Sequence, residues 1–128
     1  MTIQAISSSR LAPPVGPFSP AVRSDGYLFL SGQVGMDSSG KLVDGGVERE
    51  AEQIFANLAA VLDAAGKSFA DVVRVRVFLT DITDFAALNA VYARHFAEPY
   101  PARTTVAVAA LPLGAAVEVD AIVAVQAA

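Results

Sequence analysis

The chain has 128 residues, of which 54% are hydrophobic and 17% are charged, and its formal net charge is −4. This length suits one domain of ordinary size, so we expect a single domain over residues 1–128. The high hydrophobicity excludes a disordered chain, and the lack of cysteine excludes disulfides and thiol nucleophiles. The acidic balance argues against nucleic acid as a partner, because phosphate binding relies on basic patches.

The surface of such a chain is expected to include contacts between subunits. Charged residues are scarcer than the ~25% of an ordinary domain, so a small domain has few charges with which to cover itself. The longest apolar stretch, residues 106–117, contains a proline and a glycine and is shorter than the ~18 unbroken residues of a membrane span. Residues 1–10 contain no basic start followed by an apolar run, so we expect a cytoplasmic protein with no membrane partner.

The first third of the chain predicts three short strands. They cover residues 3–6, 22–24 and 27–33. A proline-rich loop over residues 13–20 separates the first strand from the second. The second and third strands flank Asp25-Gly26, a dipeptide that favours a two-residue type I′ hairpin turn. A further turn is expected at residues 37–40.

The middle of the chain predicts a helix followed directly by a strand. The apolar residues of the helix form one stripe, made of Ala51, Ile54, Leu58, Val61, Leu62 and Ala65. Glu48 lies near its start, where a carboxylate suits the helix dipole, and Gly66 is placed to end it. Residues 72–79 then alternate as a strand. Its apolar face is expected to carry Val73, Val75, Val77 and Leu79, and its other face Arg74 and Arg76.

The rest of the chain predicts a second helix and two more strands. The helix starts near Thr83 and ends before Pro99. Its apolar face is expected to hold Phe85, Leu88, Tyr92 and Phe96. Residues 103–109 and 116–125 predict strands that are joined by a turn at residues 111–114.

This order of elements favours an α+β fold with both helices on one face of the sheet. In the last strand, alternate positions from Val117 to Val125 are apolar, whereas Glu118 and Asp120 lie on the opposite face. That second face mixes charges of both signs with apolar residues. We therefore expect another subunit to cover part of it, where pairing makes the charges tolerable.

Three common kinds of site find no support in the residues. His95, expected at an exposed helix position, has no second histidine or cysteine with which to hold a metal, so no metal site is predicted. The glycines match no phosphate-binding loop, so no nucleotide cofactor is predicted. Ser31 lacks the surroundings of a nucleophile elbow, and turn chemistry is its default role.

Arg103 is the strongest single candidate for ligand binding. Pro99 and Pro101 restrain the approach to a strand that starts at this arginine, and a restrained guanidinium can bind a carboxylate through two parallel hydrogen bonds. Spacing alone leaves a second interpretation open, in which Arg103 is a surface or interface arginine paired with an aspartate.

Several ordered motifs, spread from about residue 6 to residue 123, together resemble one family. They are Gly16-Pro17-Phe18-Ser19, Ser31-Gly32-Gln33, Asn57-Leu58, Val77-Phe78-Leu79-Thr80-Asp81, Asn89-Ala90-Val91-Tyr92, Pro101-Ala102-Arg103-Thr104, Leu111-Pro112 and Val117-Glu118. The chain resembles the RidA family (YjgF/YER057c/UK114). The resemblance implies a chorismate-mutase-like fold with a mixed six-stranded sheet, a homotrimer, and ligand clefts between subunits. It also implies deamination of the reactive enamines and imines left by pyridoxal-phosphate enzymes, with no cofactor in the protein itself.

The resemblance also implies roles for individual residues. Arg103 would bind the carboxylate of a 2-imino acid, and Thr105 would present backbone polar groups beside the imine. Glu118 would position or activate the attacking water. The family positions that line or brace the cleft are matched here by Phe18, Ser31, Gly32 and Asn89.

Departures from the family pattern keep other functions open. Phe18 stands where the motif usually has tyrosine, which keeps an aromatic wall but removes a hydroxyl. Thr105 occupies a position that is often cysteine in relatives. Glu118 could instead be the partner of Arg74 or Arg76 in an interface ion pair. The alternatives to a deaminase are a trimer that binds small carboxylates or acts as a chaperone without turnover and, less favoured, a ribonuclease.

Overall fold

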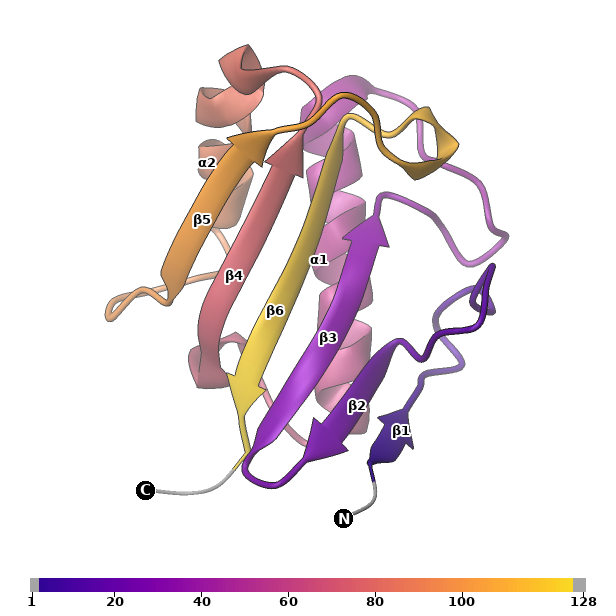
Figure 1. The fold of residues 1–128 in the computed structure, drawn as a ribbon. Helices are drawn as coiled ribbons and strands as arrows, with labels where there is room; N and C mark the ends of the chain where they lie inside the picture. The colour runs from indigo at the N-terminus through magenta and orange to yellow at the C-terminus, as the bar shows by residue number, and fades with distance from the viewer. Residues whose placement is uncertain (1–2, 126–128) are drawn as a thin grey trace.

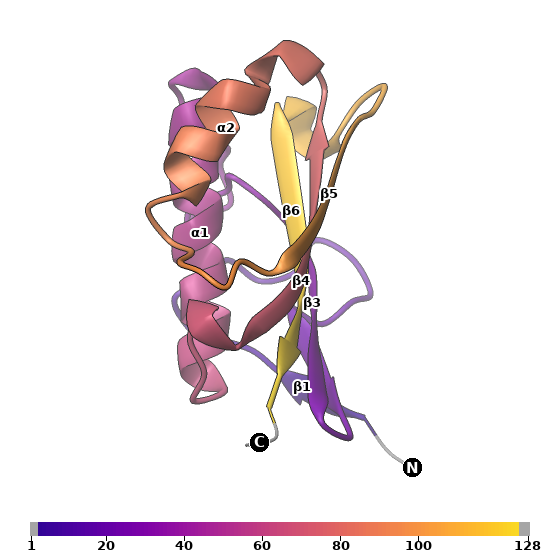
Figure 2. The same ribbon diagram turned by 90° about the vertical axis from the view of Figure 1, so that its left-hand side faces the viewer.

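A computed structural model describes residues 3–125, and over this range a mixed six-stranded sheet carries two helices on one face (Figure 1 and Figure 2). The strands are β1 (Gln4–Ile6), β2 (Ala21–Ser24), β3 (Tyr27–Val34), β4 (Val72–Leu79), β5 (Ala102–Ala107) and β6 (Val117–Ala124), and the helices are α1 (Gly46–Ala64) and α2 (Phe85–Tyr92). The sheet order is β1-β2-β3-β6-β4-β5, with β4 and β5 parallel and the other neighbours antiparallel. The expected α+β class is confirmed. Of the predicted domain over residues 1–128, residues 1–2 and 126–128 lie outside the described residues.

The hairpin of β2 and β3 has the predicted two-residue loop. Ser24 pairs with Tyr27, and Asp25 takes a left-handed conformation with φ 51°. Farther along β3 the register with β6 shifts between Leu30 and Gln33, so the strand bulges there. The sequence predicts a continuous strand at this point and gives no sign of the bulge.

Helix α1 begins at two glycines and ends at a third. Gly45 and Gly46 have φ values of 114° and 81°, so the chain enters the helix through a left-handed turn that glycine adopts at low cost. Gly66, with φ 70°, donates its backbone N–H to the Asp63 carbonyl and ends the helix as predicted. The buried Glu50 accepts a hydrogen bond from the backbone N–H of Ala116 at 2.8 Å, which ties α1 to the start of β6.

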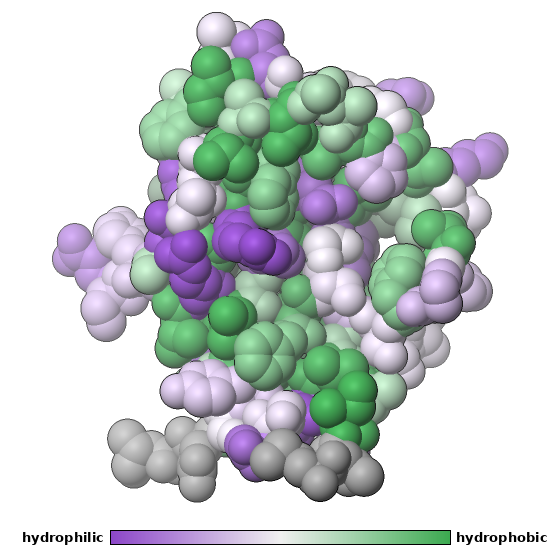
Figure 3. Space-filling view, in the orientation of Figure 1, coloured by the Kyte–Doolittle hydropathy of each residue, from purple (hydrophilic) through white to green (hydrophobic). Residues whose placement is uncertain are grey.

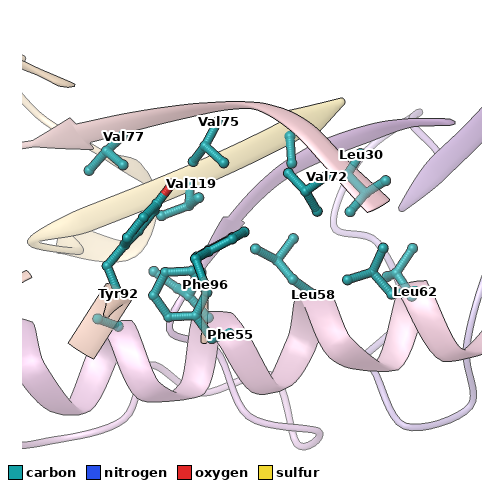
Figure 4. Packing of buried hydrophobic residues seen from close by; sticks show 14 of the residues in the cluster. Leu30, Phe55, Leu58, Leu62, Val72, Val75, Val77, Tyr92, Phe96 and Val119 are labelled. Atoms are coloured by element: carbon teal, nitrogen blue, oxygen red, sulfur yellow. The ribbon is translucent and has the colours of Figure 1, made fainter. Parts of the chain in front are cut away.

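The core lies between the sheet and the helices. Figure 4 shows Phe55, Leu58 and Leu62 of α1 facing the strands. The strands contribute the residues that alternation predicts on β6 together with Leu28, Leu30, Val75, Val77 and Leu79. Full burial of one such large apolar side chain contributes about 1.5–3 kcal/mol, so this layer fixes the helices on one face and leaves the other face open.

One strand residue and one histidine lie elsewhere than predicted. β4 has a register shift between Val72 and Arg74, so Val72 is buried at 7% exposure while Val73 is 43% exposed. The prediction that Val73 faces the helices is therefore wrong, because the irregularity reverses the alternation at the start of the strand. His95 lies in a turn past the end of α2, is partly buried and stacks on Phe55 with 4.8 Å between ring centroids, so the predicted exposed helix position is also wrong.

The second helix is shorter than predicted. Residues 82–84 form a turn of 3₁₀ helix, in which the Asp81 carboxylate accepts a hydrogen bond from the Thr83 backbone N–H. Helix α2 follows at Phe85 and ends at Tyr92. Phe85 is 42% exposed and does not belong to the buried face that periodicity predicts.

The open face of the sheet mixes charged and apolar side chains, as predicted. Figure 3 shows hydrophilic residues near the middle of this face, with hydrophobic residues above and below. Arg76 and Asp120 form an ion pair there at 2.7 Å, and Arg74 donates to the Thr104 hydroxyl at 2.6 Å. Tyr27, Phe29 and Val106 add exposed apolar surface.

Candidate functional site

Arg103 lies on the helix side of the sheet and is held by three side chains of α2. Its register partner Val75 is buried against the helices, so Arg103 points in the same direction. The Arg103 Nη2 donates to Asn89 Oδ1 at 2.6 Å, and the guanidinium carbon lies 4.6 Å from the Tyr92 ring centroid and 5.4 Å from that of Phe85. These three residues are spaced by four and three positions and so share one face of the helix.

The guanidinium of Arg103 keeps most of its hydrogen-bonding capacity. Arginine has five N–H donors, and among residues 3–125 no carboxylate forms a salt bridge with Arg103. A small cavity of about 270 Å³ adjoins it and is lined by Asn89, Tyr92, Ala93, Tyr100, Pro101 and Arg103. A fixed cation that opens on such a cavity can bind an anionic group, and its planar fork matches a carboxylate. The pairing with an aspartate that the sequence left open does not occur within the described chain.

Among residues 3–125, two buried hydroxyls on this side of the sheet have no hydrogen-bond partner. They belong to Tyr92 and Thr105, and Thr105 faces the helices because its register partner is Val77. Figure 4 shows the Tyr92 hydroxyl directed from α2 toward the sheet. Burial raises the pKa of the Tyr92 hydroxyl, and the nearby Arg103 partly opposes this shift. Buried polar atoms seldom lack a partner, so a buried water is the expected partner of each hydroxyl.

Glu118 lies on the opposite, open face of the sheet. It pairs with Phe78 of β4 and points away from the helices. Partial burial is the largest cause that raises the pKa of its carboxyl above the ordinary glutamate value, and Asp120 adds to it while Arg76 opposes it. A carboxyl with a raised pKa exchanges protons nearer to neutral pH, as acid–base catalysis requires.

The bulge in β3 fits directly under the Glu118 carboxyl. A Cβ atom placed on Gly32 would lie 2.8 Å from Glu118 Oε2 and 2.9 Å from its Cδ, so a larger residue would force the carboxyl to shift from this position. The neighbouring Ser31 donates its hydroxyl to the Ser19 carbonyl at 2.6 Å. This bond fixes the loop of residues 7–20, which carries Phe18, beside the bulge.

The 7–20 loop, the bulge and Glu118 enclose a second cavity of about 550 Å³. Its polar lining includes Ser31, Gln33, Asn57, Arg76, Glu118 and Asp120, and its apolar lining includes Leu11, Val15, Phe18, Met36, Pro112 and Leu113. Phe18 is 49% exposed and forms part of the wall. The volume lies within the range of about 300–1,000 Å³ that small-molecule sites occupy.

The predicted site residues therefore fall into two groups on opposite faces of the sheet. Arg103, Asn89 and Thr105 form one group, while Phe18, Ser31, Gly32 and Glu118 form the other. Arg103 and Glu118 are two strands and three register positions apart, which at about 4.8 Å per strand and 3.3 Å per residue separates their Cα atoms by roughly 14 Å. One copy of the chain does not bring both side chains to one small molecule.

Two features of the candidate site were not identified from the sequence. The sequence predicts Phe85 and Tyr92 as core residues, which is confirmed for Tyr92, and both rings also lie over Arg103. Their spacing from Asn89 is the signal that could have found them, because the three residues share one helix face. The Arg76–Asp120 ion pair at the edge of the larger cavity was also unassigned.

Within residues 3–125, no three histidine, aspartate or glutamate side chains gather closely enough to hold a metal ion. No helix in that range has the length and apolar character needed to cross a membrane.

Known proteins resemble this chain over nearly its whole length. "2-iminobutanoate/2-iminopropanoate deaminase" of Capra hircus is 48% identical over 118 residues, which cover 91% of this chain and 86% of that protein. The crystal structure of RidA from an Antarctic Psychrobacter species has 43% identity and a TM-score of 0.91, and the match covers 94% of this chain and 98% of that chain. The crystal structure of E. coli TdcF with bound serine has 34% identity and a TM-score of 0.88, covering 97% of this chain and 99% of that one.

The family model described as Endoribonuclease L-PSP matches residues 9–125. This match agrees with the fold and with the relatives above. The chain belongs to the RidA (YjgF/YER057c/UK114) family, which this model describes.

Proposed function

We propose that this protein hydrolyses reactive 2-imino acids and their enamine tautomers to 2-oxo acids and ammonia. The observation that carries the proposal is Arg103, a fixed guanidinium that opens on a cavity and forms no salt bridge within the described residues. Relatives with 45–48% identity are named 2-iminobutanoate/2-iminopropanoate deaminases. The bound serine of E. coli TdcF is a 2-amino acid. Its carboxylate is attached to the carbon that bears the nitrogen, as it is in a 2-imino acid.

The site is formed between copies of the chain in this proposal. Arg103 and Glu118 lie on opposite faces of one sheet, so Arg103 of one copy and Glu118 of a second copy act on the same substrate. The mixed open face with its exposed Tyr27 and Phe29 supports such a contact. We assign the assembly as a homotrimer, in which three equivalent heterologous contacts close a ring and form three clefts.

Binding orients the substrate for attack by water. The Arg103 fork holds the carboxylate, and Asn89, Phe85 and Tyr92 fix the fork. This fixed geometry places the imine carbon C2 beside Glu118 of the second copy and removes the entropic cost of finding that arrangement. The buried hydroxyl of Thr105 lies on the same face of the sheet as Arg103, two residues farther along β5.

Glu118 then moves one proton in each direction. Its carboxylate takes a proton from water while the water oxygen bonds to C2 and the C=N π electrons pass to nitrogen, which gives a carbinolamine. The protonated Glu118 returns that proton to nitrogen, the C2–N bond breaks, and ammonia leaves with the bonding pair. Loss of the hydroxyl proton completes the 2-oxo acid, so iminium and water yield the oxo acid and ammonium. The raised pKa of Glu118 suits both transfers.

The experiment generates the imino acid in place with an amino-acid oxidase and follows its hydrolysis. Wild-type protein is expected to accelerate the reaction, and Arg103→Ala is expected to lose most of this acceleration. Equal rates with wild type, variant and no protein would overturn the proposal. Binding of 2-oxo acids without any acceleration would identify a carboxylate-binding or chaperone-like trimer instead.

The name of the family model makes ribonuclease activity the second candidate. The formal charge of −4 opposes it, because RNA binding relies on basic surface. RNA cleavage that disappears on further purification, while Arg103→Ala cleaves no less than wild type before that step, would remove this candidate.

A further inference from the structure

Leu113 has a backbone conformation that leucine seldom adopts. It lies in the turn of 3₁₀ helix at Pro112–Gly114, before β6, with φ 61° and ψ 14°. In this left-handed region Cβ crowds the backbone, and glycine or asparagine is the usual occupant. The next residue, Gly114, has φ 71°, so the turn uses glycine at one of its two left-handed positions and leucine at the other.

The Leu113 side chain gains little from packing within its own chain. It is 55% exposed and lies outside the hydrophobic core. A strained residue with an exposed apolar side chain has no stabilising role that explains it, and such strain concentrates at binding sites. Packing in the core therefore does not explain Leu113, and a role in binding is the alternative.

The position of Leu113 indicates what that function is. It lines the 550 Å³ cavity that contains Glu118, together with Val15 and Phe18 of the 7–20 loop. These two side chains are also exposed, at 77% and 49%. Figure 1 shows the loop before β2 and the turn before β6 on the same side of the sheet, and Figure 3 shows the surface hollowed beside them. Three exposed apolar side chains from two segments thus surround one cavity beside the proposed acid–base group.

The groups attached to the imine carbon indicate which part of the substrate enters this cavity. The imine carbon carries three groups, which are the carboxylate, the nitrogen and the side chain. In the proposed function the carboxylate is held by Arg103 of another copy and the carbon lies beside Glu118. The substrate's own side chain then faces the apolar lining of the cavity, whose total volume of about 550 Å³ is far larger than a methyl group needs.

We infer that Leu113, Val15 and Phe18 form an apolar wall for the substrate's side chain, so that bulky apolar 2-imino acids are preferred over 2-iminopropanoate. The inference rests on the proposed function and adds the substrate class. An apolar pocket discriminates by about tenfold or more for each well-buried methylene. We therefore expect kcat/KM to be at least about tenfold higher for an isobutyl or benzyl side chain than for methyl.

The test compares three imino acids that are made by D-amino-acid oxidase from D-alanine, D-leucine and D-phenylalanine. The imine carbon is planar, so the configuration of the amino acid does not matter. The proteins are wild type, Leu113→Gly, Leu113→Asn and the control Ile3→Ala, which removes an exposed apolar side chain that precedes the edge strand β1 and lines neither cavity. For each protein, kcat/KM is measured with each substrate, and Tm is measured as well.

Wild type is expected to show the preference for bulky side chains, and Ile3→Ala to keep it. Both Leu113 variants are expected to lower the ratio of kcat/KM for the bulky and methyl substrates by about tenfold. Leu113→Gly and Leu113→Asn are also expected to keep or raise Tm, because both residues tolerate the left-handed conformation. If Leu113 had only a structural role, its variants would not lose the preference for bulky substrates while keeping their Tm.

Other outcomes separate this inference from the proposed function. Turnover of all three imino acids with no preference in wild type overturns the apolar wall and leaves the deaminase proposal standing. Equal losses for every substrate in the Leu113 variants, with a smaller assembly by light scattering, would make Leu113 a subunit contact and overturn the wall. No turnover of any imino acid removes the proposed function, and the inference falls with it.

Discussion

At the scale of single residues, Gly32 determines where the Glu118 carboxyl lies. The Cβ of an alanine at this position would approach Glu118 Oε2 to 2.8 Å, so we expect Gly32→Ala to displace the carboxyl. A displacement of about 1 Å in a catalytic group costs roughly 100-fold in rate. The expected result is a large fall in kcat with little change in Tm.

Gly35 provides the matched comparison for this prediction. An added Cβ at Gly35 would lie 2.7 Å from the backbone Cα of Glu50, so Gly35→Ala strains the contact between β3 and α1. That variant is expected to lower Tm. If Gly32→Ala also loses stability and keeps its kcat, Gly32 serves the fold and does not position Glu118.

In the proposed function the ionised Glu118 carboxylate is needed for catalysis, but it lowers the stability of the folded state. Burial raises the pKa of this carboxyl in the folded protein, so the folded state holds the proton more tightly than the unfolded state. The folded protein therefore loses stability as pH rises from the ordinary glutamate pKa of 4.5 through the raised value. Glu118→Gln removes this loss, and we expect its Tm to exceed that of wild type at pH 7 but not at pH 4.

The role of Glu118 also predicts how the activity depends on pH. A general base must be ionised, so kcat/KM of wild type is expected to fall as pH drops through the raised pKa of Glu118. Glu118→Gln is expected to lose about 100-fold or more in kcat. A Glu118→Gln protein with wild-type kcat and a lower Tm at pH 7 would identify Glu118 as a structural residue.

At the scale of elements, α2 acts as a support for Arg103. Tyr92 places its ring 4.6 Å from the guanidinium carbon, a contact worth about 1–2 kcal/mol when it is shielded from water. We expect Tyr92→Leu to raise KM about tenfold with a smaller effect on kcat. Tyr92→Phe keeps the ring and loses only a hydroxyl without a partner in the described residues, so it should retain a KM near that of wild type.

Phe69→Leu is the control for the α2 prediction. Phe69 belongs to the same aromatic cluster through Phe55 and Phe96, and its described ring contacts include neither Tyr92 nor Arg103. This variant should lower Tm and leave KM unchanged. Equal KM increases in Phe69→Leu and Tyr92→Leu would show that general loosening of the core, and not the ring over Arg103, affects binding.

The elements were predictable where one local signal dominated. The Asp25-Gly26 hairpin, the end of α1 at Gly66 and the alternation of β6 follow from turn chemistry and burial period. The exposure of Val73 was not predictable, because the register shift in β4 depends on pairing with a distant strand. The bounds of α2 were not predictable either, because the Asp81 cap starts a separate turn of 3₁₀ helix at residues 82–84 and α2 itself ends at Tyr92.

The relative placement of the site residues needed the sheet. From the sequence, Arg103 and Glu118 are candidates for one site, but β5 contains no clear apolar alternation that says which face Arg103 occupies. Its parallel register with β4 places it on the helix side, opposite Glu118. In the proposed function this arrangement requires an assembly, because a single chain keeps the two side chains apart.

At the scale of the whole molecule, the two-faced arrangement predicts that inactive variants complement each other. Arg103→Ala keeps Glu118, and Glu118→Gln keeps Arg103. In mixed trimers, a cleft is intact when Arg103 comes from a Glu118→Gln copy and Glu118 from an Arg103→Ala copy. Equal mixing with random assembly gives this combination in about one quarter of the clefts.

We therefore expect an equal mixture of the two variants, dissociated and reassembled together, to recover about a quarter of wild-type activity. Each variant treated alone should stay inactive, and the double variant Arg103→Ala/Glu118→Gln should restore neither partner. Light scattering before and after reassembly checks that the mixed assemblies have formed. Reassembled mixtures that remain inactive would mean that Arg103 and Glu118 do not meet across a subunit contact. That result would refute the shared cleft, because the single chain keeps these two side chains on opposite faces of its sheet.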